Sequence, residues 1–303
     1  MSNFIITITY LIIGILLRRV PKFPKESATT LNLFVIYVSL PALVLLKIPE
    51  MTFSSRALVP VFMPWCMLLV SALLVLTAAR IFKWNREVTG CLMLMIPLGN
   101  TSFLGIPMVQ AFFGNSGIPY AVLYDQLGSF IALATYGSVI LAIYGKDEAR
   151  QSIRDIIVKI VTFPPLIALV IATLSKNLTY PEIITHILKA LSSTLVPVVM
   201  IAVGFQLYLR LEPKVLTPLA TGLFIKLIIA PVVALLLCVM AGLRNEAAQV
   251  SIFEAGMPPM VSAGALALIA NLSPRLTAAL VGAGIIVCFA TLPLIYKIMF
   301  LWL

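Results

Sequence analysis

Three ionisable side chains stand inside long apolar segments of the chain. Lys226 lies in Phe224-Ile-Lys-Leu-Ile, Glu254 precedes a Gly- and Pro-rich stretch, and Asp125 stands beside Gln126. Ionisable groups at membrane depth are costly, and they usually mark a functional site. Lys226 is therefore predicted to be a counter-charge for an anionic substrate or to neutralise an acid. Glu254 and Asp125 are candidates to carry a coupling ion, with H⁺ as the first choice.

Each of these three side chains also has a structural explanation. Lys226 and Glu254 could form a direct ion pair, and Glu254 could instead face an aqueous vestibule. Asp125 is close enough to one end of its segment to be solvated there.

Two apolar segments, 88–113 and 247–271, are interrupted by Pro and Gly in the same way. Each Pro removes a backbone donor, and broken helices are tolerated in a bilayer only where they line a cavity. A matched pair of them is the best sequence pointer to the binding site of a secondary transporter. The predicted helix-breaking residues are Pro97, Gly99, Gly105, Pro107, Gly256, Pro259 and Gly264.

Each interruption exposes the end of a half-helix, whose unpaired N–H groups and partial positive charge bind anions. Side chains around the two breaks would then orient a substrate carboxylate, although Asn100 and Thr101 could also serve only as helix caps. The predicted substrate-binding residues are Asn100, Thr101, Ser102, Gln126, Met257, Pro258, Ser262 and Lys226.

Composition identifies the element type that must position these residues. The 303 residues are 61% hydrophobic and 11% charged, with a mean hydropathy of +1.11. An all-α integral membrane protein is expected, because each span needs roughly 20 apolar residues and ten spans fill this length. Arg18-Arg19 lie at the end of the first span, no basic residue precedes it and no small-residue cleavage site is seen, so it is predicted to be a permanent helix. The predicted spans are 3–20, 28–48, 57–82, 88–113, 118–144, 155–174, 184–208, 215–241, 247–271 and 276–302.

The net charge of +10 is unevenly distributed. Fourteen of the 21 Lys and Arg residues lie in the odd-numbered loops or in the ends of the predicted spans next to them. The positive-inside rule places these loops in the cytoplasm and both termini on the other side of the plasma (inner) membrane. Because this charge is divided among membrane loops, no nucleic-acid partner is expected.

Five helices in each half require that two related halves insert with opposite orientation. The sequence predicts a first repeat over 1–145, a cytoplasmic linker over 146–154 and an inverted second repeat over 155–303. The second helix of each half has a central proline, Pro41 or Pro197, and the fourth helix of each half is the broken one. The fourth and ninth helices are therefore expected to cross at mid-membrane.

Signals for an enzyme are missing from the sequence. The single histidine, His186, is near a loop, and no P-loop is present. The four cysteines lie inside predicted spans without metal-ligand or disulfide spacing, so they are expected to be packing residues. No enzyme activity, cofactor or metal is expected.

The interrupted segments also resemble a known family. Asn100-Thr-Ser-Phe-Leu-Gly-Ile-Pro-Met, Ala255-Gly-Met-Pro-Pro-Met-Val and Leu292-Pro-Leu-Ile-Tyr are similar to helix signatures of the auxin efflux carrier family. The resemblance implies a five-plus-five inverted repeat of the bile-acid symporter type, with a scaffold domain and a transport domain. It also implies export of small organic anions such as malate or malonate, and it matches Asn100, Thr101 and Gln126 to the family's site. Because the long hydrophilic loop of the plant members is absent, a prokaryotic member is expected.

These observations predict an efflux carrier that works by alternating access and binds a carboxylate at the crossover of broken helices. A sodium-coupled organic anion symporter is the first alternative, and a channel or sensory membrane protein is the second. A homodimer is compatible with either form of carrier.

Overall fold

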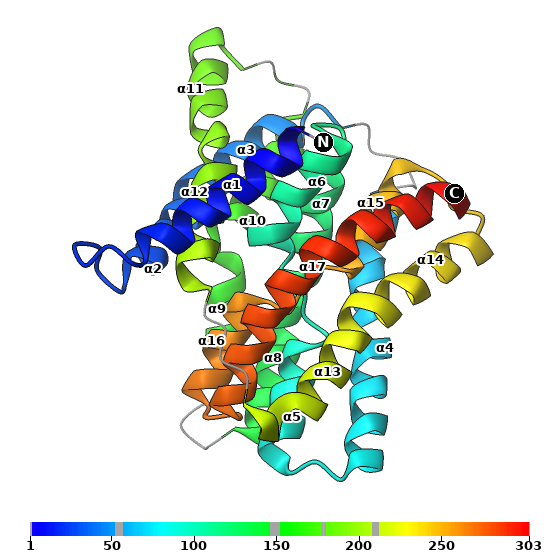
Figure 1. Ribbon diagram of the computed structural model, residues 1–303. Helices are drawn as coiled ribbons and strands as arrows, with labels where there is room; N and C mark the ends of the chain where they lie inside the picture. The colour runs from blue at the N-terminus through cyan, green and yellow to red at the C-terminus, as the bar shows by residue number, and fades with distance from the viewer. Residues whose placement is uncertain are drawn as a thin grey trace. The chain divides into compact units, whose positions relative to one another are not determined.

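Helices build the whole described part of this protein. The computed structural model describes residues 2–51, 57–145, 152–176, 178, 180–207 and 212–302 (Figure 1). Within these ranges the only strand-like feature is one isolated bridge. Most of the predicted linker 146–154 lies outside the described residues, because they stop at 145 and resume at 152.

The helical elements follow one another closely, and several are joined end to end without a loop. In chain order they are α1 (Ser2–Leu17), α2 (Ser27–Phe34), η1 (Val35–Ser39), α3 (Leu40–Lys47), α4 (Leu58–Phe82), α5 (Arg86–Met95), η3 (Thr101–Gly105), α6 (Ile106–Phe113), α7 (Ile118–Leu123), η4 (Tyr124–Phe130), α8 (Ile131–Tyr144), α9 (Ile153–Val161), α10 (Pro164–Leu174), α11 (Glu182–Ser193), α12 (Leu195–Gln206), η6 (Pro213–Val215), α13 (Leu216–Phe224), η7 (Ile225–Ile229), α14 (Ala230–Met240), α15 (Glu246–Ala255), α16 (Val261–Ile269) and α17 (Pro274–Trp302).

Among the residues that the structure describes, six continuous helices are long and apolar enough to cross a membrane. A seventh span is formed if α9 and α10, which meet at 54°, are counted as one. Every predicted span contains helix, but α1, α5, α6, α15 and α16 are individually short. The expectation of an all-α, multi-pass membrane protein is therefore confirmed at the level of class.

The chain forms two compact units. The first unit comprises Met1–Ser54, Ser102–Val122 and Ile157–Leu207, and the second comprises Ser55–Thr101, Leu123–Ile156 and Tyr208–Leu303. Neither unit coincides with a predicted repeat, because each takes residues from both halves of the sequence.

In the first unit, α1 packs closely against α12 through two glycines. A Cβ atom added to Gly14 would lie 2.1 Å from the carbonyl oxygen of Ile201, and one added to Gly204 would lie 2.1 Å from that of Leu11. Small residues at a helix crossing let two membrane helices approach until their backbones touch. The close packing of α1 and α12 therefore depends on these glycines.

We expect Gly204→Ala to reduce stability by about 1–3 kcal/mol, the usual range for overpacking, because its new methyl group would meet backbone that cannot rotate away. The apparent melting temperature of the purified protein in detergent measures this loss. Gly137→Ala in α8 is the matched control, since its Cβ would meet only side-chain atoms at 3.6 Å. Equal melting temperatures for the two variants would contradict the role of close packing.

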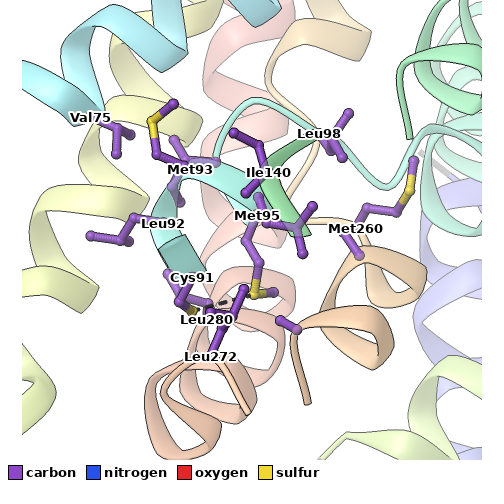
Figure 2. Packing of buried hydrophobic residues seen from close by; sticks show 14 of the residues in the cluster. Val75, Cys91, Leu92, Met93, Met95, Leu98, Ile140, Met260, Leu272 and Leu280 are labelled. Atoms are coloured by element: carbon purple, nitrogen blue, oxygen red, sulfur yellow. Dashed lines mark hydrogen bonds between the residues drawn. The ribbon is translucent and has the colours of Figure 1, made fainter. Parts of the chain in front are cut away.

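The second unit has one large apolar core, built mainly on α5 and its neighbours α8, α13, α16 and α17. Figure 2 shows members of this core, with Met95 among residues from several of these helices. The Cys91 thiol lies 3.2 Å from the Thr277 hydroxyl within this core. Cys91, Cys238 and Cys288 are buried, Cys66 is exposed, and all four are free thiols.

Candidate functional site

Two helices of the second unit, α5 and α15, begin in the same way. The side chain of Asn85 accepts a hydrogen bond from the Val88 N–H at 2.9 Å, and that of Asn245 accepts one from the Ala248 N–H at 3.0 Å. Asparagine is a preferred cap because it satisfies an N–H that the helix leaves unpaired. Each helix then runs for ten residues before its chain leaves regular geometry.

The chain after each of these helices is non-helical and contains proline. Pro97 follows α5, and Pro258 and Pro259 follow α15. Since proline lacks an N–H and clashes with the preceding turn, neither helix can continue through these positions. The residues 96–100 and 256–260 are buried throughout.

The two non-helical segments lie side by side and pair as a short antiparallel bridge between Gly99 and Pro259. The N–H of Asn100 donates to the carbonyl oxygen of Pro258 at 2.8 Å, and the N–H of Met260 donates to that of Leu98 at 3.0 Å. Buried backbone groups must find such partners. Each segment therefore satisfies polar groups that the other exposes.

Three π-helical segments carry the polar residues of this region. Thr101 begins η3, Asp125 and Gln126 lie in η4, and Lys226 lies in η7. A π turn inside an α-helix shifts the side chains that follow it, and such turns are frequent at functional sites. The sequence contains no simple signal for them, so these turns were not anticipated.

Asp125 is at the centre of a small hydrogen-bond network. The Thr101 hydroxyl donates to its Oδ1 at 2.6 Å, and the Gln126 amide donates to its Oδ2 at 2.5 Å. All three side chains are fully buried. The alternative that Asp125 is solvated at one end of its span is therefore wrong.

Glu254 is also fully buried, on the last turn of α15. Within the described part of the chain, neither of its carboxylate oxygens has a hydrogen-bond partner. It interacts electrostatically with Asp125 and with Lys226, yet no direct ion pair joins it to the lysine among the described residues. Glu254 is thus a buried carboxyl group without a donor of its own.

Lys226 reaches the paired segments from η7. Its side chain is buried, and its Nζ would lie 3.1 Å from a Cβ added to Gly99. The backbone of Gly99 does not have positive φ, so turn geometry does not demand glycine here. Glycine instead leaves room for the ammonium group beside the backbone.

A small cavity of about 10 Å³ within the second unit is lined in part by Lys226. Its lining combines apolar residues with two hydroxyl-bearing residues, Tyr124 and Ser129, both from η4. Sequence reasoning missed both, because an isolated Ser or Tyr in an apolar span is common. The lining residues are Pro64, Leu68, Pro97, Leu98, Gly99, Tyr124, Ser129, Ala132 and Lys226.

The structure brings most of the predicted binding residues into the second unit, but not all of them into one place. The Asn100 side chain is buried and its amide nitrogen has no partner within the described ranges. Met257 and Pro258 are buried in the second non-helical segment. Ser262, in the first turn of α16, is only half-buried, and Ser102 is half-buried and belongs to the first unit.

The predicted helix-breaking residues also differ in their surroundings. Pro97, Gly99 and Pro259 lie in the paired segments, and Gly256 caps α15. The remaining three lie in helix: Gly105 ends η3, Pro107 is the second residue of α6, which continues η3 without a break, and Gly264 is inside α16.

Other candidate sites are weaker. His186 is exposed and lies 3.5 Å from Glu182 on the same helix. No group of three or more His, Cys, Asp or Glu side chains suited to a metal ion occurs among the residues that the structure describes.

Comparison with known proteins gives a match along almost the whole chain. The family described as "Membrane transport protein" matches residues 1–296. An uncharacterized transporter of Methanocaldococcus jannaschii is 29% identical over 292 residues, which cover 92% of both chains. An uncharacterized transporter of Methanothermobacter thermautotrophicus is 28% identical over 291 residues, which cover 93% of both chains.

Proposed function

Because this chain belongs to the membrane transport protein family, we propose that it is a secondary active transporter of a small organic anion that works by alternating access. The family match bears out the resemblance to the auxin efflux carriers. Family membership supports only the general statement that this multi-pass protein transports something across a membrane. The substrate, the mechanism and the coupling are our proposal.

The pairing of the two non-helical segments beside Lys226 is the observation that carries the proposal. It puts a buried ammonium group, the backbone of Gly99 and a cavity of about 10 Å³ at one point. The space is about that of one water molecule, so it would have to widen during the transport cycle to admit a carboxylate head group. Lys226 would supply the positive field that makes burial of the anion tolerable.

Backbone dipoles would reinforce the lysine. η3 begins at Thr101 and α16 begins at Val261, directly after the paired residues Asn100 and Met260. Free N–H groups in the first turn of a helix favour anions. We assign the Asn100 amide, whose nitrogen has no partner in the described residues, the role of orienting the substrate carboxylate. Thr101, Gln126, Met257 and Pro258 would shape the site around it.

The moving part would be the second unit, since the paired segments, Asp125, Lys226 and Glu254 all belong to it. A rigid-body movement of this unit past the other helices would carry the site from one side of the membrane to the other. Ser102 and Ser262, which are half-buried, remain proposed substrate contacts.

The inverted repeat remains part of the proposal. The repeats would span 1–145 and 155–303, joined by the linker 146–154. The shared asparagine caps of α5 and α15, their equal length and the proline-containing segment after each support a common origin of these two helices. Ten membrane crossings, both termini on the non-cytoplasmic side of the inner membrane, and a homodimer complete the proposed organisation.

A thermal-shift screen of the purified protein against formate, acetate, malonate and malate tests the proposal. At least one carboxylate should stabilise the parent protein, and Asn100→Ala should weaken its binding by about tenfold through loss of a buried hydrogen bond. Asn115→Ala, at an exposed position, is the matched control and should respond as the parent does.

The same screen separates the alternatives. Stabilisation that requires sodium would favour a sodium-coupled symporter. If no carboxylate stabilises the parent at any pH between about 5 and 8, the range in which most proteins are most stable, the anion carrier proposal fails.

A further inference from the structure

Asp125, Lys226 and Glu254 form a buried charge cluster in which Glu254 interacts electrostatically with both the Asp125 carboxyl group and the Lys226 ammonium group. They are the only Asp, Glu, Lys or Arg residues buried within the described part of the chain. With all three ionised, the cluster carries one uncompensated negative charge. A substrate anion bound at Lys226 would add a further negative charge. An unpaired buried charge costs several kcal/mol.

The two carboxyl groups are not equivalent. Asp125 accepts hydrogen bonds from the Thr101 hydroxyl and the Gln126 amide, and such donors stabilise the charged form of a carboxylate. Neither oxygen of Glu254 has a hydrogen-bond partner in the described residues. Of the two, Glu254 is therefore the group that gains more from a proton.

Lys226 links Glu254 to the anion site. The lysine interacts electrostatically with Glu254, but its Nζ lies beside Gly99 in the cavity and makes no ion pair with the glutamate among the described residues. Its charge can therefore compensate Glu254 while no anion is bound, and the lysine lines the cavity that would widen to take the anion. One ammonium group cannot compensate both at full strength.

We propose that the transported anion binds together with one proton, which Glu254 takes up from water when the anion occupies Lys226. This inference rests on the proposed function, and it adds the residue that accepts the proton and the sign of the coupling. Because binding free energies are reciprocal, the anion must favour protonation and protonation must favour the anion. Anion and proton would then cross the membrane in the same direction.

Other titratable groups near Glu254 do not change this assignment. Tyr124 of η4 interacts with Glu254 and with Cys66 of α4, and neither a tyrosine nor a cysteine can supply a positive charge. From α17, Tyr296 packs its ring against Phe253. Asp125 and Lys226 are therefore the charged groups that act on Glu254.

Proton uptake on anion binding tests the proposal. Purified full-length protein in a weakly buffered detergent solution is titrated with formate, acetate, malonate and malate while an indicator dye reports pH. The parent should take up about one proton per bound anion, and its affinity should rise about tenfold per unit fall in pH where Glu254 titrates. Glu254→Gln should bind the same anion with no proton uptake and with an affinity independent of pH.

Glu246→Gln, at the start of the same helix α15, is the matched control and should behave as the parent does. If Glu254→Gln does not fold, infrared difference spectra of the parent replace it. Anion binding should produce a protonated-carboxyl band, and this band should shift when glutamate, but not aspartate, is labelled with ¹³C.

The outcomes separate the two levels of inference. If no carboxylate binds, the proposed function itself fails. If an anion binds without proton uptake, with sodium in place of the proton, or with proton uptake that persists in Glu254→Gln, the anion carrier stands and the role of Glu254 is refuted.

Discussion

Replacing Lys226 with methionine should lower the free energy of unfolding by about 3–5 kcal/mol near neutral pH, because it leaves the charge of the buried Glu254 carboxyl group uncompensated. Adding Glu254→Gln to this variant should recover much of the loss, since it removes that charge. Equilibrium unfolding in mixed micelles of the parent, both single variants and the double variant measures the interaction as a double-mutant cycle.

The effect of Lys226→Met should also depend on pH. Without the lysine, the folded state must bind a proton that the unfolded chain releases above pH 5, so the stability of this variant should fall as pH rises. Lys47→Met is a control at the protein surface, where Lys47 and Glu50 pair at 2.9 Å with the glutamate largely exposed. This substitution should lower the free energy of unfolding by less than about 1 kcal/mol, because solvent-exposed ion pairs usually contribute no more than that. Additive effects of the Lys226 and Glu254 changes would refute the cluster.

Gly99→Val should abolish anion binding while leaving a folded protein. A Cβ at this position would lie 3.1 Å from Nζ of Lys226, so the larger side chain must displace the ammonium group and occupy part of the cavity. The backbone at Gly99 does not have positive φ, and valine can therefore adopt it without left-handed strain. Carboxylate binding followed by thermal shift should be weakened at least about a hundredfold, equivalent to about 2.7 kcal/mol.

Gly99→Ala provides the graded comparison for this prediction. Its single methyl group requires the flexible end of Lys226 to move by only a few tenths of an ångström. The alanine variant should therefore bind with an affinity between those of the parent and the valine variant. Unchanged affinity in Gly99→Val would show that the anion does not bind at Lys226.

The sequence alone identified the class of protein and most of the chemically important residues. Long apolar segments leave few alternatives to membrane helices, and an ionisable residue inside one is conspicuous because burial of charge is so costly. Asp125, Lys226 and Glu254 were recognisable for this reason. The proline and glycine interruptions were recognisable too, since proline cannot take part in a continuous helix.

Only the tertiary structure decided how these residues meet. The bridge between Gly99 and Pro259 joins segments 160 positions apart, and no local pattern encodes such a pairing. Whether Asp125 is solvent-exposed or buried depends on what packs around η4. Lys226 lies in a π turn beside Gly99, and sequence periodicity does not reveal such turns. The residue types therefore determined which charged groups are buried in the bilayer at a cost in free energy. Long-range packing determined which of these groups lie next to one another.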